Sequence, residues 1–174
     1  MRLRIRLIIL IIVSFFRKRM SLIDENVLAL RVLPNDCDVF SLSSDRYVAL
    51  MGLGDANITL RAGLLSTIYR RKWYPMTSVA TIRYRHHLTM FQKYLLRSRA
   101  IYWNDKWIWV EHNFERNGRT QALGITKVMF VESGRIVPVS QIIDAARESL
   151  TPPPVTKIIA NLLSMEEQIK ERQR

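Results

Sequence analysis

The stretch from Leu33 to Gly54 places carboxylates directly before a predicted helix, and this arrangement is suited to catalysis. Asp36 and Asp38 lie in a segment that begins with Pro34, and these residue types favour turns over regular structure. A helix start presents N–H groups without backbone partners. A polarised carbonyl bound to those N–H groups would have a base or a nucleophile beside it.

The residues after this acidic turn have helical spacing. From Asp45 onward the apolar positions fall on one face, and Gly63 is a plausible end of the helix. We expect Ser43 or Ser44 to cap the helix by accepting a hydrogen bond from a free N–H. Asp45 in the first turn suits the positive end of the helix dipole. The predicted inner face comprises Tyr47, Leu50, Met51, Gly54 and Ile58.

The acidic turn resembles the motif of the hotdog thioesterases, and in particular the 4-hydroxybenzoyl-CoA thioesterase-like group with its membrane-associated relatives. Many members read D-x-D-x-x-G-H-x-N-N-x-x-Y. The present chain has Asp36-Cys37-Asp38 and later Arg46-Tyr47, with Ser41-Leu42-Ser43-Ser44-Asp45 where Gly-His-x-Asn-Asn would stand. The resemblance implies that Asp38 is the catalytic carboxylate. It places substrate binding at the helix start, which comprises Ser44, Asp45, Arg46 and Tyr47.

The rest of the chain predicts an α+β domain. A strand at Val27–Leu33 precedes the helix Asp45–Ala62, and a short helix follows at Leu64–Lys72. Four further strands are predicted at Met76–Arg85, Lys93–Trp103, Trp107–Glu115 and Gln121–Val131. The resemblance implies a hotdog fold, in which a curved antiparallel sheet wraps around one long central helix. We expect this domain to cover residues 21–150.

Single residues within these strands carry further predictions. Alternation puts Ala100 and Tyr102 on one face of their strand, and Trp103 on the other. On the next strand, His112 falls on the inner face, where it is more often a hydrogen-bonded core residue than a catalyst.

The N-terminal arm suggests a membrane contact. Residues 1–19 hold six basic side chains and no acidic one, which is half of the net charge of +12. Their apolar decad, Leu7–Phe16, spans about 15 Å as a helix, against a hydrocarbon core of about 30 Å. Because Arg2, Arg4 and Arg6 do not share a helical face, a regular amphipathic helix is not expected. A shallow anchor in one leaflet, a signal anchor, and a buried or disordered arm all stay open.

The C-terminal part contains two more helical patterns. Val139–Leu150 predicts a short helix, and Pro152-Pro153-Pro154 forms a stiff spacer. The apolar stripe that follows Val155 predicts an amphipathic helix, which docks on the domain or contacts a membrane or partner. We therefore divide the chain into a membrane-anchoring segment (1–20), the domain, and a spacer with a helix (151–174).

Metal and redox cofactors are not expected. Cys37 is the one cysteine, so no internal disulfide forms, and it is predicted to be a packing residue. His86 and His87 are adjacent on a strand end and face opposite ways, which makes a poor metal pair. Basic and aromatic residues between positions 83 and 109 could form a nucleic-acid platform, but a solvated or dimer-facing sheet side explains them better.

These observations lead to two functional hypotheses. The first is hydrolysis of an acyl-CoA thioester by a cytoplasmic protein that is peripheral to, or shallowly anchored at, the membrane. Asp38 would activate water or attack the carbonyl, and the sites would lie between the subunits of a homodimer or a larger homo-oligomer. The alternative is a catalytically degenerate hotdog protein that binds acyl groups or lipids, or acts as a scaffold, and the altered segment from Ser41 to Asp45 favours it.

Overall fold

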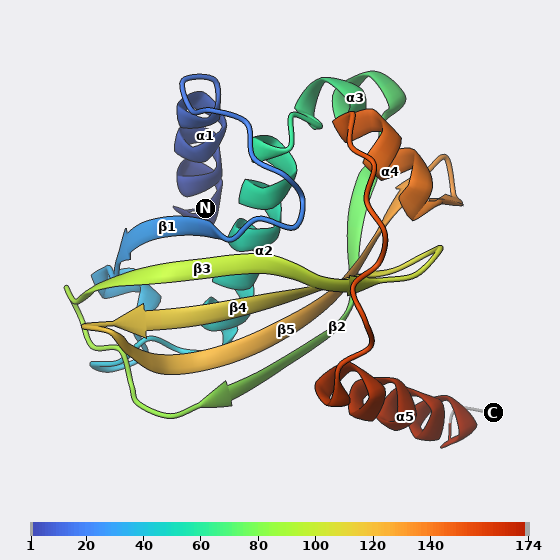
Figure 1. Ribbon diagram of the computed structural model, residues 1–174. Helices are drawn as coiled ribbons and strands as arrows, with labels where there is room; N and C mark the ends of the chain where they lie inside the picture. Colours follow the sequence, from blue (N-terminus) through green and yellow to red (C-terminus); the bar gives the residue numbers. More distant parts are fainter. Residues whose placement is uncertain (1, 173–174) are drawn as a thin grey trace.

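The computed structural model describes residues 2–172, in which one curled antiparallel sheet wraps around a central helix (Figure 1). The strands are β1 (Asn26–Arg31), β2 (Tyr74–Tyr84), β3 (Lys93–Trp103), β4 (Ile108–Arg116), β5 (Arg119–Glu132) and β6 (Arg135–Val137). The helices are α1 (Arg2–Ser14), α2 (Ser44–Arg61), α3 (Leu65–Arg71), α4 (Val139–Ala146) and α5 (Lys157–Arg172), with one 3₁₀ turn, η1 (Pro34–Asp36). The predicted α+β hotdog arrangement is confirmed.

The sheet has the strand order β1-β3-β4-β5-β2, and β6 pairs with the end of β5. The β4–β5 hairpin turns at Asn117-Gly118, where both residues have positive φ (52° and 71°). Such a turn matches the right-handed twist of the strands it joins. Both edge strands, β1 and β2, leave one side of their backbone without a strand partner in this sheet.

Helix α2 lies on the concave face of the sheet, and its apolar face is buried as predicted. Two glycines allow this close approach. A Cβ at Gly54 would come within 2.8 Å of His112 Nδ1 and closer still to Ser98 Oγ. Across the interface, a Cβ at Gly124 of β5 would collide with the sulfur of Met51. The helix therefore rests directly on the backbone and the small side chains of the sheet.

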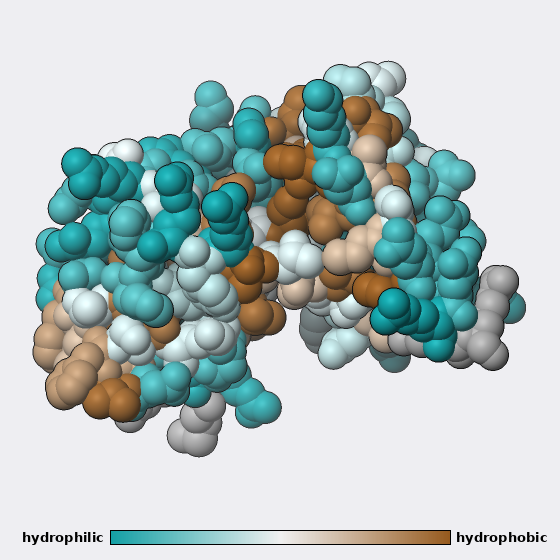
Figure 2. Space-filling view, turned by 90° about the horizontal axis from the view of Figure 1, so that it is seen from below, coloured by the Kyte–Doolittle hydropathy of each residue, from teal (hydrophilic) through white to brown (hydrophobic). Residues whose placement is uncertain are grey.

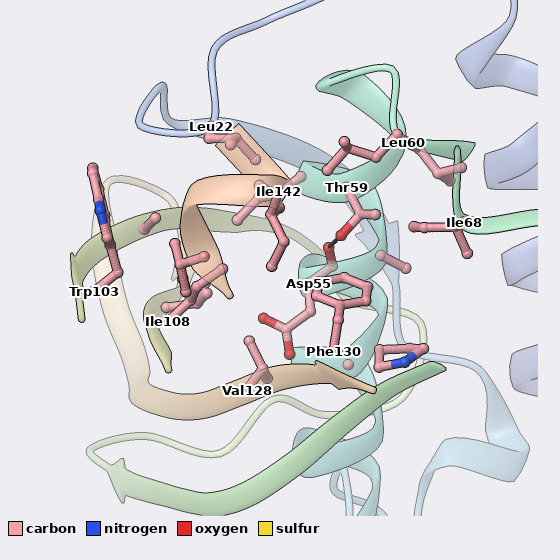
Figure 3. A pocket seen from close by; sticks show the side chains of 18 of the residues that line it. Leu22, Asp55, Thr59, Leu60, Ile68, Trp103, Ile108, Val128, Phe130 and Ile142 are labelled. Carbon is pink, nitrogen blue, oxygen red and sulfur yellow. Dashed lines mark hydrogen bonds between the residues drawn. The ribbon is translucent and has the colours of Figure 1, made fainter. Parts of the chain in front are cut away.

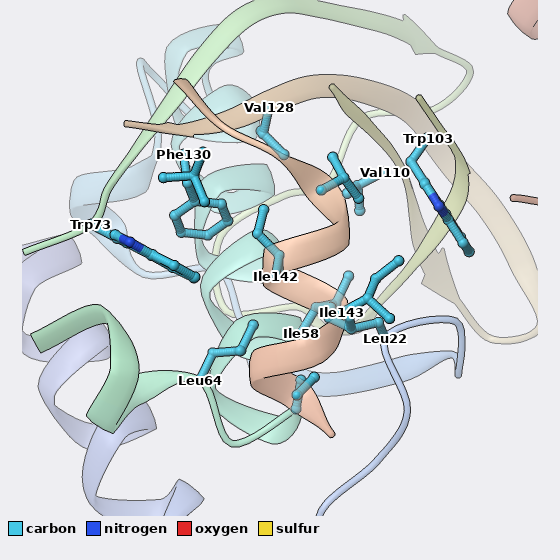
Figure 4. Close-up of a cluster of buried hydrophobic side chains, with 14 residues drawn as sticks. Leu22, Ile58, Leu64, Trp73, Trp103, Val110, Val128, Phe130, Ile142 and Ile143 are labelled. Carbon is cyan, nitrogen blue, oxygen red and sulfur yellow. The ribbon is translucent and has the colours of Figure 1, made fainter. Parts of the chain in front are cut away.

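The core beneath α2 is divided along the length of that helix. The N-terminal half packs Tyr47, Leu50 and Met51 against Leu96 and Phe114 of the sheet. The C-terminal half belongs to a second cluster that helix α4 closes from above (Figure 4). This second cluster includes Ile58, Leu64, Trp73, Trp103, Val110, Val128, Phe130, Ile142 and Ile143.

One predicted strand face is wrong at its end. Tyr102 was expected on the face of Ala100 and Trp103 on the opposite one. The register of β3 against β4 shifts between Ala100 and Tyr102, which marks a β-bulge. A bulge adds one residue to a strand and so reverses the alternation beyond it. Trp103 is therefore buried in the same cluster as Val110, and Tyr102 packs on the convex face against Trp109.

The N-terminal arm forms a helix from Arg2 to Ser14; the spacing of its arginines argued only against a regular amphipathic helix. Helix α1 packs along α2, and Leu10 is buried between them. Arg6 turns inward to an acidic partner, so it need not share a solvent face with Arg4. Within residues 2–172, no single helix has the length and apolarity needed to cross a bilayer, although the bent pair α2 and α3 meets that test jointly.

Helix α5 docks on the convex face of the sheet. Ile159 is fully buried against Trp109, and Lys127 of β5 forms a buried ion pair with Glu166. The Lys127 ammonium also lies 4.5 Å from the ring centre of Trp107, a cation–π contact. Figure 2 views the molecule from the side of β2 and α5, where apolar side chains gather in a central recess with hydrophilic ones around it.

Candidate functional site

The acidic turn is a small, well-bonded loop that precedes α2. After η1 the chain makes two isolated antiparallel bridges: Cys37 pairs with Leu42, and Ser41 pairs with Thr89, which precedes β3. The Asp38 N–H donates to the Ser41 carbonyl at 3.2 Å. The Leu42 N–H donates to the Leu88 carbonyl at 2.8 Å. These bonds fix the loop next to the helix start.

The two carboxylates of this turn have opposite environments. Asp36 is buried at 5% exposure, accepts the Leu33 N–H at 3.0 Å, and pairs with Arg6 of α1 at 2.5 Å. Asp38 lies at the exposed tip of the loop, beside Val39 and Phe40, which are 72% and 73% exposed. Asp36 therefore anchors the loop, whereas Asp38 is free to meet a ligand.

The helix start differs in detail from the prediction. Ser43 is the N-cap residue, but its hydroxyl donates to the Asp45 carboxylate and does not accept from a backbone N–H. This hydrogen bond, more than the nearby Arg46, lowers the pKa of Asp45 below its ordinary value. The N–H groups of Arg46 and Tyr47 donate to the Ser43 carbonyl, and the Asp45 N–H faces its own carboxylate. The Ser44 N–H is therefore the group of this turn that could meet an external acceptor.

The four predicted substrate-binding residues separate into two groups. Ser44, Asp45 and Arg46 lie at the surface, and Arg46 pairs with Asp45 at 3.5 Å. Tyr47 is 1% exposed and packs edge-to-face on Phe114 with ring centres 4.9 Å apart. Burial raises the pKa of the Tyr47 hydroxyl, which accepts the Leu88 N–H at 3.4 Å. In this structure Tyr47 is a core residue that orients the loop.

Cys37 is not built as a nucleophile. Its thiol donates to the Leu33 carbonyl at 3.7 Å. Burial raises the pKa of that thiol, and the charges of Asp36 and Asp38 raise it further. A raised pKa keeps the reactive thiolate scarce. Among residues 2–172, no group of three or more His, Cys, Asp or Glu side chains is placed to hold a metal ion.

Sequence reasoning missed a second polar constellation, which lies beneath the middle of α2. The fully buried His112 places Nδ1 2.9 Å from Ser98 Oγ and Nε2 3.2 Å from Asp55 Oδ1. His112 Nε2 also bonds to Thr126 Oγ1 at 3.0 Å, and the Thr126 hydroxyl donates to the Asp55 carboxylate at 3.1 Å. Asp55 follows Gly54 at the edge of an otherwise apolar helix face. An acidic residue beside the buried face was the feature of the sequence that could have indicated this polar cluster.

The described arrangement allows two kinds of chemistry. At the acidic turn, an exposed carboxylate lies on the loop that leads into the helix start, where the Ser44 N–H is available, and this arrangement suits attack on a carbonyl. Beneath α2, the hydrogen-bonded chain runs from Ser98 through His112 and Thr126 to Asp55. It is closed off because Gly54 covers Ser98, which is 1% exposed. Ser98 therefore has no access to a substrate, and only Asp55 of this chain borders an open space.

Two curated relatives share part of the sequence. The protein named THEM6 from Xenopus laevis is 30% identical over 84 residues, which are 48% of this chain and 41% of that protein. THEM6 from Drosophila melanogaster is 23% identical over 101 residues, 57% of this chain and 52% of that protein. The chain thus spans about half the length of the curated relatives it matches.

Solved structures share the fold at low identity. A gentisyl-coenzyme A thioesterase superposes with a TM-score of 0.63 at 21% identity, covering 70% of this chain and 98% of that one. A DHNA-CoA thioesterase from Staphylococcus aureus gives a TM-score of 0.64 at 6% identity, covering 86% of this chain and 95% of that one. A further Staphylococcus aureus protein, solved in complex with CoA, gives 0.60 at 12% identity, covering 77% and 91%.

The family assignment rests on the sequence match over most of the domain. The model of the thioesterase-like superfamily matches residues 32–154, from the end of β1 to the spacer before α5. This range contains the acidic turn, α2 and the whole sheet apart from β1. The chain therefore belongs to the thioesterase-like superfamily.

Proposed function

We propose that this protein hydrolyses the thioester of an acyl-CoA at a membrane surface. The observation that carries the proposal is the exposed Asp38 carboxylate on the loop that leads into α2, in a chain of the thioesterase-like superfamily. Three structural neighbours bear names that include coenzyme A thioesters or CoA itself. The net charge of +12 favours an anionic ligand such as CoA.

In the proposed mechanism, Asp38 activates a water molecule or attacks the thioester carbonyl directly. The N–H group of Ser44, at the start of α2, stabilises the negative charge that develops on the carbonyl oxygen. Asp36 and Arg6 hold the loop in place by their buried pair. Collapse of the tetrahedral intermediate would break the carbon–sulfur bond and release the thiolate of CoA. After water attack, the proton taken up by Asp38 passes to this thiolate; after direct attack, water hydrolyses the anhydride between the acyl group and Asp38.

The proposal includes a second copy of the chain. Val39 and Phe40 extend beside Asp38 with about three quarters of their side chains exposed. The eleven-residue edge strand β2 is likewise exposed along most of its length. Exposed apolar loops and long free strand edges are suited to contact with another protomer. A site at such an interface would be closed to water only in the oligomer.

Substitution of Asp38 tests the enzymatic proposal. Because general base catalysis contributes roughly 10²–10⁴-fold, we expect Asp38→Asn to lower acyl-CoA hydrolysis by about a hundredfold or more. The melting temperature should stay within a few degrees, since the side chain is exposed. The measurement is thiol release from a panel of acyl-CoAs by the purified full chain.

Two further variants serve as controls for that test. Asp105→Asn changes another exposed carboxylate on the β3–β4 turn and should leave the rate unchanged. Asp36→Asn should instead lower stability, because it leaves the Arg6 charge without its buried partner, a change that costs about 3–5 kcal/mol in such pairs. Equal rates in wild type and Asp38→Asn would sink the mechanism.

The second candidate function is binding of an acyl group or lipid without hydrolysis. It is favoured by the segment Ser41–Asp45, in which the Ser43 hydroxyl is occupied by the adjacent Asp45 carboxylate. In the resembling family, His and Asn side chains stand in this segment. Acyl-CoA binding by the wild type, with no hydrolysis of any substrate in the panel, would select this candidate.

A further inference from the structure

A cavity of about 340 Å³ lies between α2, α4 and the concave face of the sheet (Figure 3). This volume falls at the lower end of the range of about 300–1,000 Å³ that ligand sites occupy. Its walls are almost entirely apolar and include Ile58, Trp103, Val128, Phe130 and Ile142. Leu7 and Ile11 of α1 close another side. We refer to this space as the α2–α4 cavity.

Among the described residues that line the α2–α4 cavity, Asp55 has the one charged side chain. Its carboxylate extends from α2 toward the ring of apolar side chains, with Val128 and Ile108 nearby in Figure 3. The side chain is 17% exposed. It accepts the Thr126 hydroxyl with Oδ1 at 3.1 Å and Oδ2 at 3.2 Å. His112 Nε2 lies 3.2 Å from Oδ1.

This network fixes Asp55 but does not use its full acceptor capacity. An ionised carboxylate has about four acceptor positions. The side-chain hydrogen-bond donor to Asp55 among the described residues is the Thr126 hydroxyl, on the sheet side, and His112 Nε2 bonds to Thr126 Oγ1 at 3.0 Å. A charged group that faces an apolar space costs free energy unless a donor reaches it. A bound molecule that brings a hydrogen-bond donor into the cavity would supply that missing partner.

The residues around Asp55 indicate which kind of hydrogen-bond donor a ligand would bring into the cavity. The Thr59 hydroxyl already donates to the Asp55 carbonyl at 2.9 Å, so it does not offer a donor to a ligand. The surroundings of Asp55 thus present an acceptor to the cavity. A cationic donor would have to approach a protein with a net charge of +12 and leave water for a site with one carboxylate. A neutral hydroxyl on an apolar body meets these conditions best.

We propose that the α2–α4 cavity binds an acyl group that carries a hydroxyl, and that Asp55 accepts the hydrogen bond from this hydroxyl. The inference rests on the proposed acyl thioester substrate and adds its chemical class. A site built to bond a hydroxyl discriminates against the analogue that lacks it, because the buried acceptor is then left unpaired. Asp55 is thus a specificity-determining residue, separate from the reacting carbonyl.

Binding of matched acids tests this assignment without any need for hydrolysis. The ligands are decanoic acid and hydroxydecanoic acids with the hydroxyl in the middle or at the end of the chain, titrated into the full chain by calorimetry. We expect the best hydroxy acid to bind about tenfold or more tightly than decanoic acid. Equal affinity of the wild type for all of these acids would overturn the proposal, whether or not any variant folds.

Two variants test whether Asp55 causes the preference for the hydroxy acid. Asp55→Asn should reduce the preference for the hydroxy acid to a few-fold or less, because a bond to a charged acceptor is the stronger kind. Thr59→Val changes a wall residue of the same cavity and should keep the preference. A preference that survives in Asp55→Asn would overturn the role of this residue.

The outcomes separate this inference from the proposed activity. Selective binding of a hydroxy acid in a protein that hydrolyses no acyl-CoA would support the cavity assignment and contradict the enzyme. Hydrolysis of acyl-CoAs with no discrimination between hydroxylated and plain chains would support the enzyme and contradict the cavity assignment.

Discussion

Gly54 is the position at which α2 comes closest to the sheet, and it offers a sharp test of the packing. Gly54→Ala gains helix propensity of about 1 kcal/mol. The added methyl group would however press on Ser98 and His112, and overpacking of this kind costs about 1–3 kcal/mol. We expect a net loss of stability in urea unfolding.

Gly52 is the matched control for that substitution. It lies on the same helix, and a Cβ there would meet nothing within 4 Å. Gly52→Ala should therefore stabilise the protein by up to about 1 kcal/mol. Equal stabilisation by Gly52→Ala and Gly54→Ala would contradict the close contact between α2 and the sheet at Gly54.

Tyr94 predicts how stability responds to alkaline pH. Its ring is buried, and its hydroxyl has no hydrogen-bond partner among the described residues. Burial raises the pKa of this hydroxyl, so the folded state holds the proton more tightly than the unfolded chain does. Its contribution to stability is therefore complete below about pH 10, the unfolded pKa, and is lost as the pH rises through the folded pKa.

Tyr94→Phe should consequently shift the midpoint of alkaline unfolding to higher pH. At neutral pH the variant should be as stable as the wild type or more so, since it removes an unpaired buried hydroxyl. Tyr69→Phe, at a position 87% exposed, should change neither property. The measurement is thermal unfolding over a pH series. A marked loss of stability in Tyr94→Phe at neutral pH would show that the hydroxyl has a partner.

Local pattern was sufficient for some residues and not for others. The helical spacing of α2 predicted its buried face, and the alternation in β4 predicted the inward position of His112, because burial repeats with the period of each element. The buried position of Trp103 was not predicted, because a bulge reverses the alternation of its strand. The role of Asp55 was not predicted, because its partner Thr126 lies 71 residues further along the chain, and no local sequence pattern indicates such a pair.

At the scale of elements, α1 has two different faces. Leu10 is buried in the core, whereas Ile5, Ile8, Ile9 and Ile12 are each about half exposed. Phe15 and Phe16 follow with 73% and 87% exposure, and a basic triplet comes next. Membrane attachment stays a prediction, and this outer face is the surface we propose for it.

The double substitution of Ile8→Asp with Ile12→Asp tests this surface. Both side chains point outward, so we expect little change in melting temperature but a large loss of sedimentation with anionic lipid vesicles. Ile158→Asp, on an exposed part of α5, should keep the attachment. Vesicle binding that persists in the double variant but disappears with Ile158→Asp would assign the contact to α5.

The elements themselves were more predictable than their roles. The strands and helices from β1 to α5 were expected within a few residues, apart from the three-residue β6, which is too short to leave a periodic pattern. The docking of α1 was not predictable, because it depends on the pairing of Arg6 with Asp36 across 30 positions of sequence. The division of the chain into an arm (1–20), a domain (21–150) and a spacer with a helix (151–174) stays a prediction.

At the scale of the whole molecule, we expect the chain to form a dimer or a larger homo-oligomer through the β2 edge. Ala80→Lys places a charge on this edge strand, and such charges oppose strand-to-strand pairing. Sedimentation velocity should then show a smaller species than the wild type.

The other edge strand supplies the control. Ala29→Lys adds the same charge at an exposed position of β1 and should leave the assembly intact. A wild-type monomer with full hydrolytic activity would contradict both the assembly and a site shared between protomers.

The ion pair between Arg6 and Asp36 also couples two distant properties by thermodynamic linkage. Since Asp36 anchors the acidic turn and Arg6 belongs to α1, a ligand that binds only the ordered turn also favours the docked helix. Linkage is reciprocal, so any surface that draws α1 away from α2 weakens that ligand by the same free energy. A bound substrate should therefore slow amide hydrogen exchange throughout α1, and not only around Leu7 and Ile11, which line the α2–α4 cavity.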